Sequence, residues 1–135
     1  MLRKILFISS VTLLFLTIPH PALADVSAQF KQAEGYKDNR QYQQAEAIYQ
    51  QIITDFPDTN DALEAQKQLT VVYIAWDRQP QAEAAYQQLL ANYSEDKRLA
   101  EAVRSIGDAY NDSGRYKKAI ELYQYVVDNW PQHEH

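Results

Sequence analysis

The chain has 135 residues, a formal net charge of −5 and no cysteine. The missing cysteine excludes a disulfide framework and thiol catalysis. An acidic balance without a basic stripe argues against nucleic-acid binding.

The N-terminal residues 1–24 have the pattern of a cleaved secretory signal. A basic start at Arg3 and Lys4 precedes an apolar run over 5–18, and residues 22–24 (Ala-Leu-Ala) are small enough for a signal peptidase. The run has 14 residues, whereas a membrane-spanning helix needs about 20. No cysteine is available for a lipid anchor. A stable membrane anchor is therefore not expected after cleavage.

Cleavage is expected before Asp25, so the mature chain would be periplasmic or secreted. Without Arg3 and Lys4 it carries 11 basic and 18 acidic residues, which is a net charge of −7. About 110 residues without disulfides are enough for one domain whose core alone holds the fold.

Residues 26–60 are predicted to form two helices joined by a turn at 38–40. Ala33 and Tyr36 mark the buried face of the first helix. The second helix has an apolar stripe at Tyr42, Ala45, Ile48, Tyr49, Ile52 and Ile53.

Residues 61–97 repeat this pattern with a turn at 76–80 that has no glycine. Pro80 suits the first turn of the following helix. The segments 58–61 and 94–96 are expected to supply N-cap oxygens to the helices after them. The apolar positions are Leu69, Thr70 and Tyr73, then Ala82, Tyr86, Leu89 and Leu90.

Residues 98–135 give the clearest unit. Gly114 is expected to end its first helix in the left-handed conformation. The two stripes are Val103, Ile106, Gly107 and Tyr110, then Tyr116, Ala119, Ile120, Tyr123, Val126, Val127 and Trp130.

The three units share a period of 37 residues. Its columns are Tyr36, Tyr73 and Tyr110; Ala45, Ala82 and Ala119; Tyr49, Tyr86 and Tyr123; and Phe56, Tyr93 and Trp130. A fixed period of this kind indicates stacked helical units, each burying its apolar face against its neighbour. The sequence therefore predicts an all-α fold of six helices without a strand.

The third unit resembles the tetratricopeptide repeat at Gly107, Tyr110, Gly114, Tyr116, Ala119, Tyr123 and Pro131. The spacing, and the Phe56-Pro57-Asp58 ending, are similar to exported bacterial members such as the Tol-Pal coordinator and the outer-membrane assembly lipoproteins. The second unit departs from the family at Thr70, Gln79 and Ser94, and the period exceeds the usual ~34. The resemblance implies a short right-handed α-solenoid that binds other proteins.

In this family the first helix of each repeat lines a concave groove that holds peptides or partner helices. By resemblance, the lining residues here are Phe30, Lys67 and Arg104; Glu34, Val71 and Asp108; and Lys37, Ile74 and Asn111. Apolar Val71 and Ile74 on a nominally exposed face favour a covering partner. The alternative is that Val71 and Ile74 only broaden the buried stripe.

A second candidate surface lies at the C-terminal end, because no further helix covers the third unit. Its candidate residues are Leu122, Tyr125, Val126 and Trp130. Self-association there, as a structural subunit, is the alternative to groove binding.

No catalytic, metal or cofactor site is predicted. The histidines after residue 24, His133 and His135, both lie at the very end. They lack a third fixed ligand. The expected function is a non-catalytic scaffold that binds a protein or peptide in the cell envelope, without nucleic acid.

Overall fold

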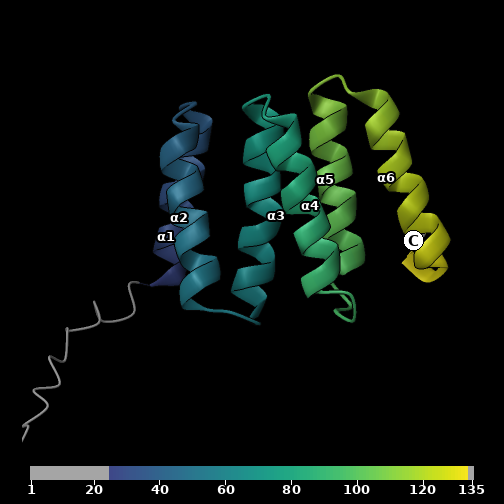
Figure 1. Cartoon of the computed structure of the whole chain (residues 1–135), viewed down its shortest axis with the longest axis horizontal. Coiled ribbons are helices and arrows are strands. Elements are labelled where there is room, and N and C mark those ends of the chain that lie inside the picture. Colours follow the sequence, from purple (N-terminus) through teal and green to yellow (C-terminus); the bar gives the residue numbers. More distant parts are fainter. Residues whose placement is uncertain (1–24, 134–135) are drawn as a thin grey trace, which may run out of the picture.

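A computed structural model describes residues 25–133. Within that range the chain is all-α, as predicted, and has no strand. Figure 1 shows the helices standing side by side in a row that follows the chain. The elements are α1 (Val26–Asp38), α2 (Tyr42–Asp55), α3 (Asn60–Ala75), α4 (Gln79–Asn92), α5 (Leu99–Asp112), α6 (Tyr116–Asn129) and the short 3₁₀ helix η1 (Pro131–His133).

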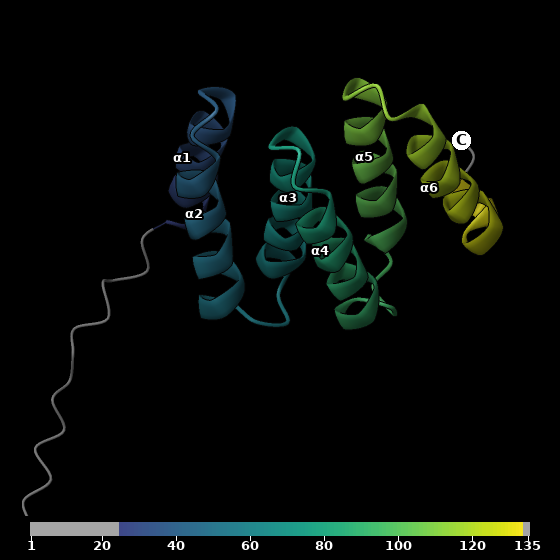
Figure 2. The ribbon, with the colours of Figure 1, turned by 45° about the horizontal axis from the view of Figure 1, so that its top comes forward.

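The helices form three antiparallel pairs, α1 with α2, α3 with α4, and α5 with α6. The first pair joins the second through α2 against α3, and the second pair joins the third mainly through α3 against α5. Figure 2 shows the row from a second direction, with α3 between its neighbours. Because it contacts helices of all three pairs, α3 lies at the centre of the core.

The turns inside the three pairs share one backbone conformation. Gly114 has φ +77°, which confirms the expected left-handed residue, and Arg40 and Asp77 stand at the same repeat position with φ +59° and +58°. The turn without glycine therefore uses Asp77, a residue type that tolerates this conformation. As a result the first helices end 37 residues apart, at Asp38, Ala75 and Asp112.

The third pair is closely packed at Gly107. A Cβ built on Gly107 would lie 2.7 Å from Cε1 of Tyr123, closer than real contacts allow. The Tyr123 hydroxyl donates a hydrogen bond of 2.7 Å to Asp108 on the same helix as Gly107. This hydrogen bond raises the pKa of Tyr123 to about 12. The missing side chain at Gly107 thus allows α5 and α6 to approach each other closely.

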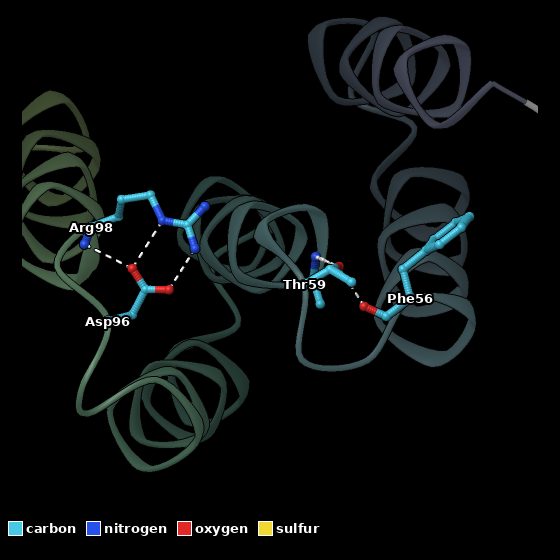
Figure 3. Close-up of polar contacts among 5 residues, drawn as sticks. Phe56, Thr59, Asp96 and Arg98 are labelled. Atoms are coloured by element: carbon cyan, nitrogen blue, oxygen red, sulfur yellow. Dashed lines mark hydrogen bonds and ion pairs between the residues drawn. The ribbon is translucent and has the colours of Figure 1, made fainter.

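The two links between pairs differ in how they start the next helix (Figure 3). Thr59 is the expected N-cap of α3: its hydroxyl oxygen accepts from the Ala62 amide at 3.1 Å. The N-cap prediction for 94–96 is wrong, because α5 begins after Arg98 without a side-chain cap. Asp96 instead accepts from the Arg98 amide and from its guanidinium Nε, both at 2.9 Å.

Replacing two glycines, Gly107 and Gly35, by alanine should change the stability of the protein in opposite directions. We expect Gly107→Ala to lower the free energy of unfolding by about 1 kcal/mol, because overpacking of about 1–3 kcal/mol exceeds the gain in helix propensity of about 1. Gly35→Ala is the matched control, since nothing lies within 4 Å of its added Cβ. It should raise stability by about 0.5–1 kcal/mol. Urea denaturation measures both; equal shifts of the two variants would contradict the close contact.

The Asp96–Arg98 pair should add stability that disappears in acid. Hydrogen bonding to Arg98 lowers the pKa of Asp96 from 3.8 to about 2. A carboxylate whose pKa falls on folding stabilises the protein above its unfolded pKa, and this contribution is lost as the pH falls from about 4 to 2. Because both side chains are partly exposed, we expect Asp96→Asn to cost only about 0.5–1 kcal/mol at pH 7.

The test is urea denaturation of the wild type and Asp96→Asn at pH 7, 4, 3 and 2. The stability difference should shrink steadily below pH 4. Glu95→Gln is the control variant. It removes the carboxylate next to Asp96 in the sequence, which has no ion partner within residues 25–133. A difference for Asp96→Asn that stays constant down to pH 2 would contradict the assignment.

Candidate functional site

A groove of about 580 Å³ opens at the C-terminal ends of the first helices of the three pairs. Because α1, α3 and α5 end at the same repeat position, their last turns meet at one end of the row. The lining residues are Lys37 and Asp38 from α1; Val71, Ile74 and Ala75 from α3; Ala109 and Asp112 from α5; and Asp77, Ser113 and Arg115 from the turns.

The floor of this groove is apolar and belongs mainly to α3. Ile74 is only 2% exposed, whereas Val71 is half-buried and Ala75 is exposed. Ala109 supplies the matching small surface from α5. Small and apolar side chains along the floor leave room for a segment of a ligand.

The rim of the groove carries more acid than base. Asp77 forms an ion pair with Arg115, which ties the second turn to the third. Asp38 and Asp112 have no ion partner among residues 25–133, and neither has Lys37. The helix C-termini at this end add partial negative charge. The groove therefore favours a ligand that combines apolar and cationic groups.

Three of the nine residues predicted for the groove line it, namely Lys37, Val71 and Ile74. Ile74 is buried within the chain, so it broadens the buried stripe, which is the alternative that the sequence left open. Its side chain offers a partner little surface.

The other six predicted groove residues lie outside this cavity. Four of them have partners within the chain. The Phe30 ring packs on Tyr49 with centroids 6.0 Å apart, Lys67 pairs with Glu64 at 2.7 Å, Arg104 lies 3.8 Å from Glu101, and Asp108 accepts from Tyr123. Glu34 and Asn111 are exposed.

The residues that the sequence prediction missed lie at the helix ends. Asp38, Ala75 and Asp112 form one column of the 37-residue period, directly before each turn. This column could have been recognised, because all three residues lie where a first helix is predicted to meet its turn. Asp77 and Arg115 could not, because their roles depend on a contact between two turns.

The predicted C-terminal face needs a correction. Leu122 is 3% exposed and cannot belong to an exposed surface. Val126 and Trp130 are half-buried against the core. Tyr125 is 36% exposed and its ring packs edge-on against Trp130 at 5.8 Å. Besides Tyr125, the large apolar side chains that α6 exposes are Tyr116 at 63%, Ile120 at 65% and Val127 at 40%.

A second groove of about 440 Å³ lies across α2, α3 and α4. Its wall contains four glutamines. Gln66 is buried and donates to the Ala85 carbonyl at 3.0 Å, so it serves the packing of α3 on α4. The others are Gln50, Gln81 and Gln88.

The described part of the chain has no helix that is both long and apolar enough to cross a bilayer. Residues 25–133 also contain no cluster of three potential metal ligands. The predicted signal segment, residues 1–24, and His135 lie outside the described residues.

Two family models, both described as tetratricopeptide repeat, match this chain. One matches residues 27–59 and the other residues 78–134. The matches include α1 and α2, then α4 to α6, and leave out α3. No curated protein matches the sequence.

Proposed function

Because this chain belongs to the tetratricopeptide repeat family, whose repeats generally mediate protein–protein interactions, we propose that it is a non-catalytic interaction module. It holds a peptide or a helix of a partner protein in the groove at the ends of α1, α3 and α5. The observation that carries this proposal is the groove itself, about 580 Å³ with an apolar floor and charged rim.

The chemistry of the groove narrows the class of partner. The floor of Val71 and Ala75 suits an apolar side chain, while Asp38 and Asp112 on the rim suit a lysine or arginine. A segment with an apolar residue next to a basic one fits both features. The groove is open to solvent, so its occupant can be part of a longer chain.

We also propose that the protein acts in the cell envelope after export. The support is the sequence pattern of residues 1–24, a basic start followed by a short apolar run and Ala22-Leu23-Ala24. The resemblance to exported bacterial repeat proteins agrees with this location.

A bulky cation in the groove should abolish partner binding. We expect Ala75→Arg to lower affinity at least tenfold, because its side chain occupies the groove and its charge repels a cationic ligand. Ala75 is exposed, so the fold should tolerate the change. Ala47→Arg is the matched control at an exposed position of α2 outside the groove.

The binding test has two steps. A photo-reactive residue at Ala75 in the native host identifies the partner by mass spectrometry, and calorimetry with the purified partner then compares wild type, Ala75→Arg and Ala47→Arg. Asp38→Asn with Asp112→Asn should weaken binding about fivefold, in line with two rim charges. A partner that binds Ala75→Arg as well as wild type would contradict the groove.

The export proposal predicts the mass of the mature protein. Intact mass spectrometry of the envelope fraction should show a chain that begins at Asp25. Ala24→Arg should block cleavage, because the peptidase requires a small residue there. The proposal would be disproved if the wild-type protein were found in the cytoplasm with residues 1–24 still attached.

A further inference from the structure

Helix α6 carries an exposed apolar stripe of Tyr116, Ile120 and Val127, which we call the α6 stripe. Spacings of four and seven residues place these side chains on one helical face. Figure 1 shows α6 at the end of the row, with helices on one side only. Exposed apolar side chains that share a face, unlike scattered single ones, indicate an interaction surface.

The repeat shows what covers the same positions elsewhere in this chain. Two periods (74 residues) earlier, Tyr42, Glu46 and Ile53 of α2 occupy the equivalent positions. The Tyr42 ring lies 6.0 Å from Trp76, and the Tyr73 hydroxyl donates to Glu46 at 2.5 Å. A helix therefore covers this face in the first repeat, and a helix fits it in the third.

The α6 stripe differs from its counterparts at one position. Glu46 and Glu83 occupy the column in which α6 has Ile120. Glu46 accepts a hydrogen bond, and Glu83 forms an ion pair with Lys118 at 3.1 Å. Ile120 can do neither, so the helix that covers α6 must present an apolar surface there.

The N-terminal helix of a second copy is a poor match for this surface. In a head-to-tail stack, α1 would take the place that α3 takes against α2. It presents Gln32 where α3 has Leu69, and Asn39 follows it where Trp76 follows α3. Burying these amides against Ile120 would leave polar groups without partners.

The α6 stripe of a second copy does match. We propose that two copies associate through their α6 helices, antiparallel and related by a two-fold axis. Apolar residues then meet apolar residues, with Ile120 near the centre. Lys117 and Asp128 flank the stripe on one side at opposite ends, so the two-fold axis brings each Lys117 opposite Asp128 of the second copy.

The charges that would pair between copies are free within one copy. Lys117 forms no ion pair among residues 25–133, and Asp128 only accepts a hydrogen bond of 2.7 Å from Gln124. A stable dimer commonly buries about 800 Å² on each partner. One helical stripe offers less, so we expect a weak dimer that forms at high micromolar concentration.

The first experiment measures the mass of the purified protein in solution by sedimentation equilibrium, from about 10 μM to 1 mM. Wild type should change from monomer to dimer over this range. Ile120→Glu should weaken the dimer at least tenfold, while Ala47→Glu on the exposed side of α2 should leave it unchanged. A wild type that stays monomeric, or an Ile120→Glu variant that dimerises equally well, would overturn the proposal.

A charge-exchange experiment tests the antiparallel arrangement. Lys117→Glu and Asp128→Lys should each weaken self-association, because like charges then face each other across the axis. An equimolar mixture of the two variants should recover the wild-type dimer to within about threefold. Lys117→Glu places a negative charge in the first turn of α6, and Asp128→Lys places a positive charge in its last turn. Both charges interact favourably with the helix dipole, so folding should be preserved. A mixture that recovers nothing would overturn the antiparallel pairing, as would species larger than a dimer, which indicate head-to-tail stacking.

Discussion

The burial of α3 between helices of both neighbouring repeats is the constraint on which the rest of the structure depends. Nine of its sixteen residues are buried. Two of these are polar, and each finds a partner: Gln66 donates to the Ala85 carbonyl, and the Thr70 hydroxyl donates to the Gln66 carbonyl. Because buried polar groups are costly without partners, the bond from Gln66 to Ala85 favours one position of α3 against α4, while the Thr70 bond satisfies its hydroxyl within α3.

The position of α3 also makes the groove. Its last turn provides Val71, Ile74 and Ala75, and the last turns of α1 and α5 stand on either side. The floor therefore belongs to the central helix, whereas the rim consists of helix ends and turns. In the proposed function, the apolar floor would contact the apolar groups of a ligand and the charged edges would contact its charged groups.

Equivalent positions of the repeat acquire different roles at the end of the row. Tyr42 of α2 packs near Trp76 of the next repeat, while the equivalent Tyr116 is 63% exposed. The substitution of Ile120 for the glutamates of the earlier repeats makes this end more apolar. The two surfaces that we propose for binding other proteins therefore differ: one is a groove at the helix ends and the other is a stripe along the last helix.

The sequence by itself determined the six helices, their pairing and most of the core, because these depend on local periodicity and on turn residues such as Gly114. It also pointed to Lys37 and Val71 as groove residues. It reversed the places of two isoleucines: Ile74, expected on a nominally exposed face, is 2% exposed, and Ile120, expected in the apolar stripe of the last helix, is 65% exposed. Only the tertiary structure decided this, because the burial of an apolar side chain depends on the neighbouring helix that covers it, and helices of other repeats supply that cover.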